Sequence, residues 1–380
     1  MLDPVRLTER LVALDTVSAR PNATLIGDLA EQLTALGARV QTVPKPGDAE
    51  QINLLAWLGP DPVAGERAGL ALAGHTDTVP WDDSMRATTA PERDGRRLYG
   101  RGTCDMKGAI AAMVCAVERV DVGALKRPLA LAFTFQEEIG CLGAKELVHG
   151  AGSIDLPVAH CIIGEPTDLR PVTQHKGYVI ARVFLRGVPC HSSDPDQGIS
   201  AIHAGALAID ALVSLGERWK ERRDPTGRLA PPWTTLNIGL FDGGAARNMV
   251  AENAAFTVEV RPLPGQDPSA LLDEVEATAR AAASRVRGIQ LRMERVEIDV
   301  PLATAEDAPL VRWLVERTGR APGTVPFYTE GAFFTELGAT TVICGPGEIA
   351  QAHRVDEWVE LDALEEAAQV YRAAIEEHCT

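Results

Sequence analysis

The sequence has no run of about 18 consecutive apolar residues, the length that a membrane-spanning helix needs, so we expect no membrane span. It also has no Cys-X-X-Cys pair. Its seven cysteines are scattered, and their number is odd. This pattern favours reduced thiols that pack as small apolar groups over a disulfide framework.

Basic residues are scarce. The 37 Lys and Arg residues are outnumbered by 53 Asp and Glu, which gives a net charge of −16. Binding to nucleic acid or to an acidic membrane requires a basic face, so we expect neither partner. The first ten residues, MLDPVRLTER, also lack the basic start and apolar run of a signal peptide. Together with the reduced thiols, this predicts a cytoplasmic protein.

A complete glycine-rich phosphate loop is missing as well. The segment GRGTCD at 100–105 has neither a strand directly before it nor the full glycine spacing. This argues against a nucleotide-binding α/β enzyme. The sequence shows no internal repeat and no low-complexity tract.

The 380 residues are enough for two domains, and 46% apolar with 24% charged residues is typical of a globular protein. Near-continuous apolar strands alternate with helices, which predicts a mainly parallel sheet covered on both faces. We expect strands at 53–59, 68–74, 128–136, 158–166 and 340–347, and helices at 3–14, 23–37, 105–120, 144–150 and 360–377.

The middle of the chain has a different pattern. Expected strands at 176–187, 234–244, 253–263 and 289–298 alternate apolar and polar residues, with helices at 199–215 and 269–286. The order strand, helix, two strands, helix, strand is typical of a compact α+β unit. We therefore predict an α/β domain formed by 1–174 and 299–380, interrupted by an inserted α+β domain at 175–298.

Metal-binding types of side chain follow the predicted strands of the larger domain. They are His75, Asp77, Glu137, Glu138, Glu165 and His353, with Asp105 at the start of a helix. Singly, each is more simply a solvated charge or a structural histidine. Gathered at one edge of one sheet, they would repel one another unless cations neutralised them. Five ligands with one shared carboxylate suit two zinc-like ions.

Seven stretches, in order, carry a resemblance to a known family. They are GHTDTVP, GRGTCDMKGAIAAM, EEIGCLGA, IIGEPT, GVPCHSSDPDQGISAI, NMVAENAAFTVEVRPLPG and GPGEIAQAHRVDEWVEL. The sequence resembles the co-catalytic zinc hydrolases that include aminoacylases, carboxypeptidase G, succinyl-diaminopimelate desuccinylase and acetylornithine deacetylase. The resemblance extends over nearly the whole chain. It implies a mainly parallel-sheet zinc-hydrolase domain with an inserted lid and dimerisation domain.

The resemblance assigns metal ligands residue by residue. His75 and Glu165 would hold one ion, Glu138 and His353 would hold the other, and Asp105 would bridge them. It implies two Zn²⁺ per subunit, with Co²⁺ able to substitute.

The resemblance also assigns roles next to the ligands. Glu137 would be the general base, and Asp77 would orient His75 through its other ring nitrogen. The adjacent glutamates would thus have separate tasks, because neighbours on an extended segment point to opposite sides. Gln136 stands where many relatives carry an acid, and we expect it to point away from the site. A cis peptide is implied between Asp105 and Met106.

The inserted domain would contribute in a homodimer. The resemblance implies that His191 reaches the active site of the other protomer and donates to the developing oxyanion. Asn248 and Arg261 match positions that bind the substrate carboxylate. From the residues alone, His191 is more simply a histidine in a polar loop. Arg261 could be a surface charge at a strand end.

The resemblance implies hydrolysis of an N-acyl amino acid, with N-acetyl-L-ornithine as the expected substrate and acetate and ornithine as products. Glu330 could face the δ-ammonium of ornithine, or it could be an ordinary loop acid. The alternatives are a succinyl-diaminopimelate desuccinylase or another N-acyl-amino-acid deacylase. A binding protein that had kept the fold and lost the reaction would need a missing ligand or base, and none is missing.

Overall fold

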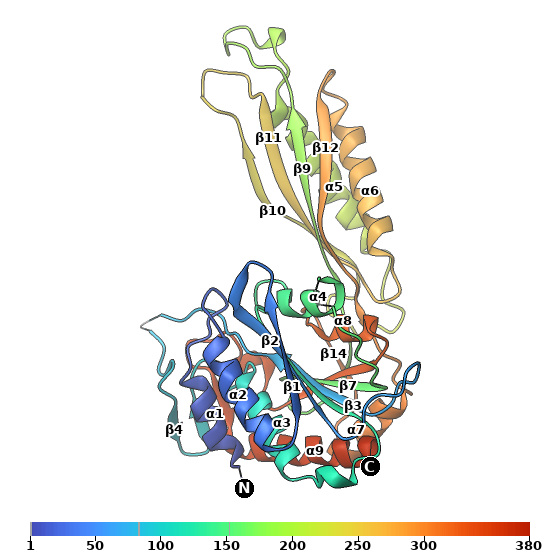
Figure 1. Ribbon diagram of the computed structural model, residues 1–380. Coiled ribbons are helices and arrows are strands. Elements are labelled where there is room, and N and C mark those ends of the chain that lie inside the picture. Colours follow the sequence, from blue (N-terminus) through green and yellow to red (C-terminus); the bar gives the residue numbers. More distant parts are fainter. Residues whose placement is uncertain (1, 83, 152) are drawn as a thin grey trace. The chain divides into compact units, whose positions relative to one another are not determined.

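The computed structural model describes residues 2–82, 84–151 and 153–380. The chain divides into two compact units. The first contains Met1–Thr173, Thr304–Gly323 and Thr329–Thr380, and the second contains Gln174–Ala303 and Thr324–Tyr328. The second unit is therefore built mainly from the middle of the sequence, which Figure 1 colours from green to orange.

A large mixed sheet has most of its strands in the first unit. Among the described residues its strands are β1 (Arg39–Lys45), β2 (Asp48–Leu58), β6 (Leu129–Thr134), β3 (Leu70–His75), β7 (His160–Pro166), β15 (Thr340–Gly345), β8 (Val172–His175) and β13 (Leu302–Ala303), in that spatial order, with β14 (Gly323–Val325) beside β8. The central strands β6, β3, β7 and β15 are parallel, whereas β1, β2 and β8 join antiparallel. The prediction of a mainly parallel sheet is confirmed for this centre.

Helices cover both faces of this sheet. On one face, the apolar core contains residues of α1 (Pro4–Val12), α2 (Ala23–Ala35), α3 (Lys107–Glu118), α7 (Pro309–Thr318) and α9 (Leu361–Cys379) (Figure 1). Ile162 and Val342 point into that core. Their neighbours Ile163 and Thr341 point the other way, and Gly331 at the start of α8 (Gly331–Glu336) lies against them. The helices α8 and α4 (Leu142–His149), which contact each other, cover this second face.

A small antiparallel sheet joins two distant parts of the first unit. Its strands are β4 (Glu92–Asp94), β5 (Arg97–Tyr99) and β16 (Trp358–Glu360), with β5 in the middle. The strand β5 precedes the loop that carries Asp105, and β16 follows the segment that carries His353. Short 3₁₀ turns occur at Val122–Ala124 and Ile349–Gln351.

The second unit is an antiparallel sheet with helices on one face. The strands β10 (Thr235–Gly243), β11 (Asn253–Arg261), β9 (Tyr178–Arg186) and β12 (Gln290–Asp299) lie in that order. The helices α5 (Ala201–Trp219) and α6 (Pro268–Ala283) pack on alternate buried residues of these strands. The 3₁₀ turn Pro195–Gln197 precedes α5. The pairs β10–β11, β11–β9 and β9–β12 are all antiparallel.

Among the described residues, none of the helices combines the length and apolar character that a membrane span requires.

Candidate active site

The site of the first unit lies where the parallel strands end. His75 is the last residue of β3, and Glu165 is the last residue but one of β7. Glu137 and Glu138 lie in the turn after β6. Both β6 and β7 pair with β3 in parallel, so these strand ends are neighbours at one edge of the sheet.

Two further residues reach this edge from loops. Asp105 lies two residues before the start of α3, and its peptide bond to Met106 is cis, as the resemblance implies. His353 follows β15 and the 3₁₀ turn, in the left-handed backbone region at φ 62°. Neither position follows from strand periodicity, because both depend on the course of a loop.

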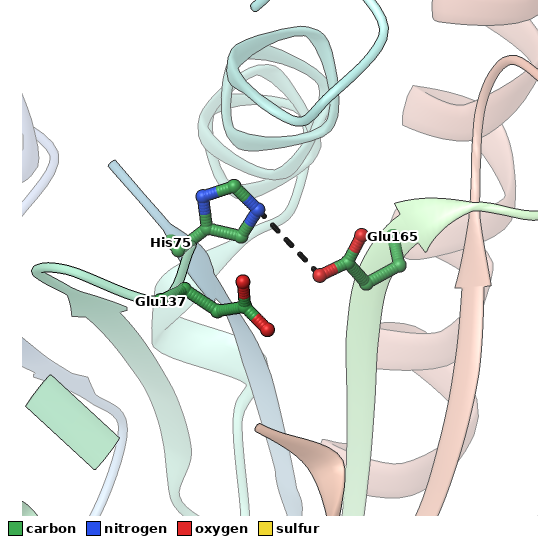
Figure 2. Close-up of side chains that lie close together, drawn as sticks. All are labelled: His75, Glu137 and Glu165. Atoms are coloured by element: carbon green, nitrogen blue, oxygen red, sulfur yellow. Dashed lines mark ion pairs between the residues drawn. The ribbon is translucent and has the colours of Figure 1, made fainter. Parts of the chain in front are cut away.

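His75 is the centre of a first group of possible ligands. Its Nε2 atom lies 3.0 Å from Oδ1 of Asp105 and 3.5 Å from Oε1 of Glu165. Figure 2 shows Glu137, from the turn after β6, and Glu165, from β7, extending toward the space beside the His75 ring. The ligand atoms of His75, Glu137 and Glu165 all lie within 4.8 Å of one another, close enough to surround one ion.

His353 forms a second group on the other side of Asp105. Its Nε2 atom lies 3.0 Å from Oε2 of Glu138 and 3.3 Å from Oδ2 of Asp105. Asp105 therefore presents Oδ1 to His75 and Oδ2 to His353. A carboxylate with one oxygen toward each histidine has the arrangement that a ligand shared by two ions needs.

Burial and mutual contact shift the pKa values of these groups. Burial lowers the pKa of His75, but hydrogen bonds with Asp105 and Asp77 outweigh it and leave the pKa well above its ordinary value. Hydrogen bonds with Asp105 and Glu138 raise the pKa of His353 to about 10. Burial, followed by the charge of Asp105, raises the pKa of Glu138 and of Glu165.

The donor set of this cluster fits divalent metal ions. Among the described residues, the carboxylates of Asp105, Glu138 and Glu165 form their ion pairs with the imidazoles of His75 and His353. Burial of three carboxylates with only two imidazoles as partners costs free energy, unless further positive charge is bound there. Imidazole nitrogen and carboxylate oxygen are also the ligand types that zinc accepts.

Glu137 lies beside the possible ligands, and its carboxylate has a polar partner. The Cys141 thiol donates to its Oε1 atom at 3.3 Å. Burial raises the pKa of Glu137 to about 8, and the nearby charges of Glu138, Asp77 and Glu330 add to the shift. The preceding Gln136 points away, as expected, because its amide contacts Nζ of Lys45 and the backbone oxygen of Ser18.

Asp77 lies behind His75. The Nδ1 atom of His75 is 3.0 Å from the backbone oxygen of Asp77 and 3.6 Å from its Oδ1 atom, so the backbone makes the closer contact. The Asp77 carboxylate instead accepts the Ser18 hydroxyl at 2.6 Å and the backbone N–H groups of Glu137 and Glu138. Asp77 therefore orients both the histidine and the turn that carries the two glutamates.

Glu330 is fully buried at the start of α8. The Thr134 hydroxyl donates to its Oε2 atom at 2.6 Å, and its Oε1 atom has no hydrogen-bond partner among the described residues. Burial raises the pKa of this carboxyl to about 7. One oxygen thus remains for a cation or a proton.

The remaining predicted residues belong to the second unit. His191 is exposed, and the backbone N–H of Ser193 donates to its Nδ1 atom at 3.1 Å. An imidazole whose Nδ1 accepts carries its proton on Nε2, which is then a donor. The backbone oxygen of Asn248 accepts the Ser192 N–H at 3.0 Å. Arg261 donates from Nε to Glu259 at 2.7 Å and lies over the Tyr178 ring.

Sequence reasoning missed the role of Glu357. This residue lies in the quoted motif GPGEIAQAHRVDEWVEL, but an acid after Arg, Val and Asp reads as an exposed loop charge. It is only 1% exposed, and its carboxylate contacts the loop of Asp105. Its position four residues after His353 is the feature of the sequence that links Glu357 to the site.

Comparison with known proteins gives the same assignment of fold and family. The model of the peptidase family M20/M25/M40 matches residues 71–377. An acetylornithine deacetylase of Myxococcus xanthus is 40% identical, over 98% of this chain and 96% of its own length. One from Photorhabdus laumondii is 33% identical, over 99% of this chain and 97% of its own.

Solved structures show the same fold at lower identity. Aminopeptidase PepT of Bacillus cereus has a TM-score of 0.76 at 21% identity, covering 98% of this chain and 97% of its own. Bacillus subtilis YxeP, described as a dinuclear metal-binding peptidase, has a TM-score of 0.71 at 14% identity, covering 99% and 97%. With the full-length relatives and the family match, these findings show that the chain belongs to the peptidase family M20/M25/M40.

Proposed function

We propose that this protein is a metal-dependent amidohydrolase that converts N-acetyl-L-ornithine to L-ornithine and acetate. The observation that carries the proposal is the convergence of His75, Asp105 and His353 with three glutamates at one edge of the sheet. The choice of substrate is supported by the full-length relatives, which are named acetylornithine deacetylases. They favour this substrate over succinyl-diaminopimelate and other N-acyl amino acids.

The cofactor in this proposal is a pair of Zn²⁺ ions per subunit, with Co²⁺ able to substitute. His75 and Glu165 would hold one ion, Glu138 and His353 the other, and Asp105 both. The two faces that Asp105 presents and the dinuclear metal binding of YxeP support this division. Ions bound there supply Lewis-acid chemistry, which polarises the acyl carbonyl of the substrate and acidifies water.

The proton transfers are assigned to Glu137. Its carboxylate accepts a proton from the water that attacks the acyl carbon. It then returns that proton to the amine nitrogen as the carbon–nitrogen bond breaks. The thiol of Cys141 and the backbone contact with Asp77 hold Glu137 in place for this task. The next residue of the same turn, Glu138, contacts His353, which supports its assignment as a ligand.

The second unit would complete the site in a homodimer. His191 carries the Nε2 proton that an oxyanion donor needs, and we assign this role to His191 of the other protomer. Asn248 and Arg261 would bind the substrate carboxylate, for which a guanidinium is well suited. Exposed apolar side chains on this unit, among them Val213, Leu240 and Phe241, support its role as the dimerisation surface.

A substrate panel tests the proposal. Metal-free protein, prepared with a chelator, is assayed before and after addition of Zn²⁺ on N-acetyl-L-ornithine, N-acetyl-L-citrulline, N-acetyl-L-methionine and N-succinyl-diaminopimelate. We expect no turnover without metal, and with Zn²⁺ the highest kcat/KM on N-acetyl-L-ornithine. A higher kcat/KM on another member, or full activity of the chelated protein, would contradict the proposal.

A further inference from the structure

The loop that carries Asp105 has little regular structure to hold it. Residues 100–106 lie between β5 and α3, outside any helix or strand, and all of them are buried. Buried backbone N–H groups need acceptors, and such a loop cannot take them from a sheet ladder. Asp105 must nevertheless keep its two carboxylate oxygens toward two different histidines.

A single carboxylate supplies those acceptors. The Oε1 atom of Glu357 accepts the backbone N–H groups of Gly102, Cys104 and Asp105, at 2.9, 3.0 and 3.1 Å. Its Oε2 atom accepts Nη1 of Arg101 at 2.5 Å. Both oxygens of Glu357 therefore accept hydrogen bonds from donors of the same loop.

The backbone of Glu357 is fixed on the same side. Its carbonyl oxygen accepts the N–H of Gly100 at 3.1 Å, and the next residues, Trp358–Glu360, form β16, which pairs with β5. Glu357 therefore joins the start of the Asp105 loop to the segment that follows His353. The two joined segments are 252 residues apart in the sequence.

We propose that Glu357 is a positioning residue of the metal site, which sets the orientation of Asp105 between His75 and His353. This inference rests on the proposed function, because it assumes that Asp105 is the shared ligand. In this proposal Glu357 is not itself a metal ligand. It acts through the backbone of the loop, and its pairing with Arg101 balances its own buried charge.

Replacement of Glu357 by glutamine removes the negative charge that pairs with Arg101, while the side chain keeps nearly the same size. The amide has one acceptor oxygen, so its NH₂ group must face either Arg101 or the three backbone N–H groups, and donor then meets donor. We expect the Zn²⁺ affinity of metal-free Glu357→Gln to fall about 10- to 100-fold, the usual effect of losing a partner behind a ligand. Saturating Zn²⁺ should restore much of kcat.

The matched control is Glu365→Gln. Glu365 also pairs with an arginine through two hydrogen bonds, at 2.7 and 2.9 Å from Arg119, but between α9 and α3. Its Zn²⁺ affinity should equal that of the wild type. Affinity is measured by competition with a chromophoric chelator, and the unfolding midpoint of each metal-free variant is measured beside it.

A folded Glu357→Gln protein with wild-type Zn²⁺ affinity would overturn the inference, whatever its stability. If Glu357→Gln does not fold, Arg101→Lys replaces it. That variant keeps the positive charge and loses the Nη1 geometry, so its affinity should fall in the same direction, and an unchanged affinity would again overturn the inference. A wild-type protein that bound no Zn²⁺ would instead contradict the proposed function.

Discussion

The Oδ1 atom of Asp77 accepts the backbone N–H of Glu137 at 2.9 Å. Its other oxygen accepts the N–H of Glu138 at 3.3 Å and the hydroxyl of Ser18 at 2.6 Å. The carboxylate at the end of β3 therefore fixes the turn after β6, where the proposed base and a proposed ligand are neighbours. The separation of their tasks depends on this contact between two strand ends.

Asp77→Asn should disturb that turn. An asparagine side chain offers one acceptor oxygen, so one of the two backbone N–H groups would face an NH₂ donor. We expect kcat/KM to fall about 10- to 100-fold, with weaker Zn²⁺ binding. Ser18→Ala, which removes only the hydroxyl donor, should have a smaller effect. Asp77→Asn kinetics within twofold of the wild type would argue that the contact is unimportant.

Glu137→Gln and Glu138→Gln should differ in kind. Loss of a general base costs about 10²- to 10⁴-fold in kcat, and Glu137→Gln should show this loss with two ions still bound. Glu138→Gln should lose metal, because Glu138 contacts His353 within the second group. Metal analysis of both purified variants beside their kinetics checks the contrast. A metal-loaded Glu137→Gln enzyme with near-normal kcat would remove Glu137 from the mechanism.

Glu330→Gln tests the origin of substrate preference. We propose that the free Oε1 atom of Glu330 binds the δ-ammonium of ornithine. A hydrogen bond to a charged group contributes about 1.5–3 kcal/mol. We therefore expect kcat/KM on N-acetyl-L-ornithine to fall by about one to two orders of magnitude, with little change on N-acetyl-L-methionine. An equal loss on both substrates would instead assign Glu330 a supporting role beside Thr134.

The gathering of candidate residues at the strand ends could be predicted without the resemblance. The apolar runs that become β3, β6 and β7 predict parallel neighbours, and parallel strands bring His75, Glu137 and Glu165 to one edge. Asp105 and His353 follow loops of no regular period. They were assigned a place in the site by the resemblance, and the structure brings both within 3.3 Å of other predicted ligands.

Other features could not be predicted from local pattern. The strand β1 was missed because its residues are mostly exposed and form no apolar run. Glu357 looked like a loop charge because its partners, Gly102 to Asp105, are more than 250 residues away. A hydrogen bond from a backbone N–H group cannot be predicted from the type of the donor residue, because every residue except proline has such a group.

Stability at low pH should depend on the pair His160 and His378. Their rings lie 4.6 Å apart, with Arg127 close to both. Burial, followed by the charges of His160 and Arg127, lowers the pKa of His378 from 6.5 to about 4. Between these values the unfolded chain binds more protons than the folded one, so the free energy of unfolding falls as pH decreases from 6.5 toward 4.

His378→Gln removes one titrating group of this pair. Its free energy of unfolding, from urea denaturation at pH 7 and pH 5, should fall less between the two values than that of the wild type. The other acidic and basic groups are common to both proteins and cancel in the comparison. Identical pH dependence of the two proteins would show that the neutral form of His378 contributes nothing.

The central claim is that Asp105 is shared by two ions, each with its own histidine. Equilibrium titration of the metal-free protein with Zn²⁺ tests this most directly, with His353→Ala titrated in parallel. The account predicts two tightly bound ions per chain in the wild type and one in the variant. Binding of a single ion by the wild type, or of two tight ions by His353→Ala, would contradict it.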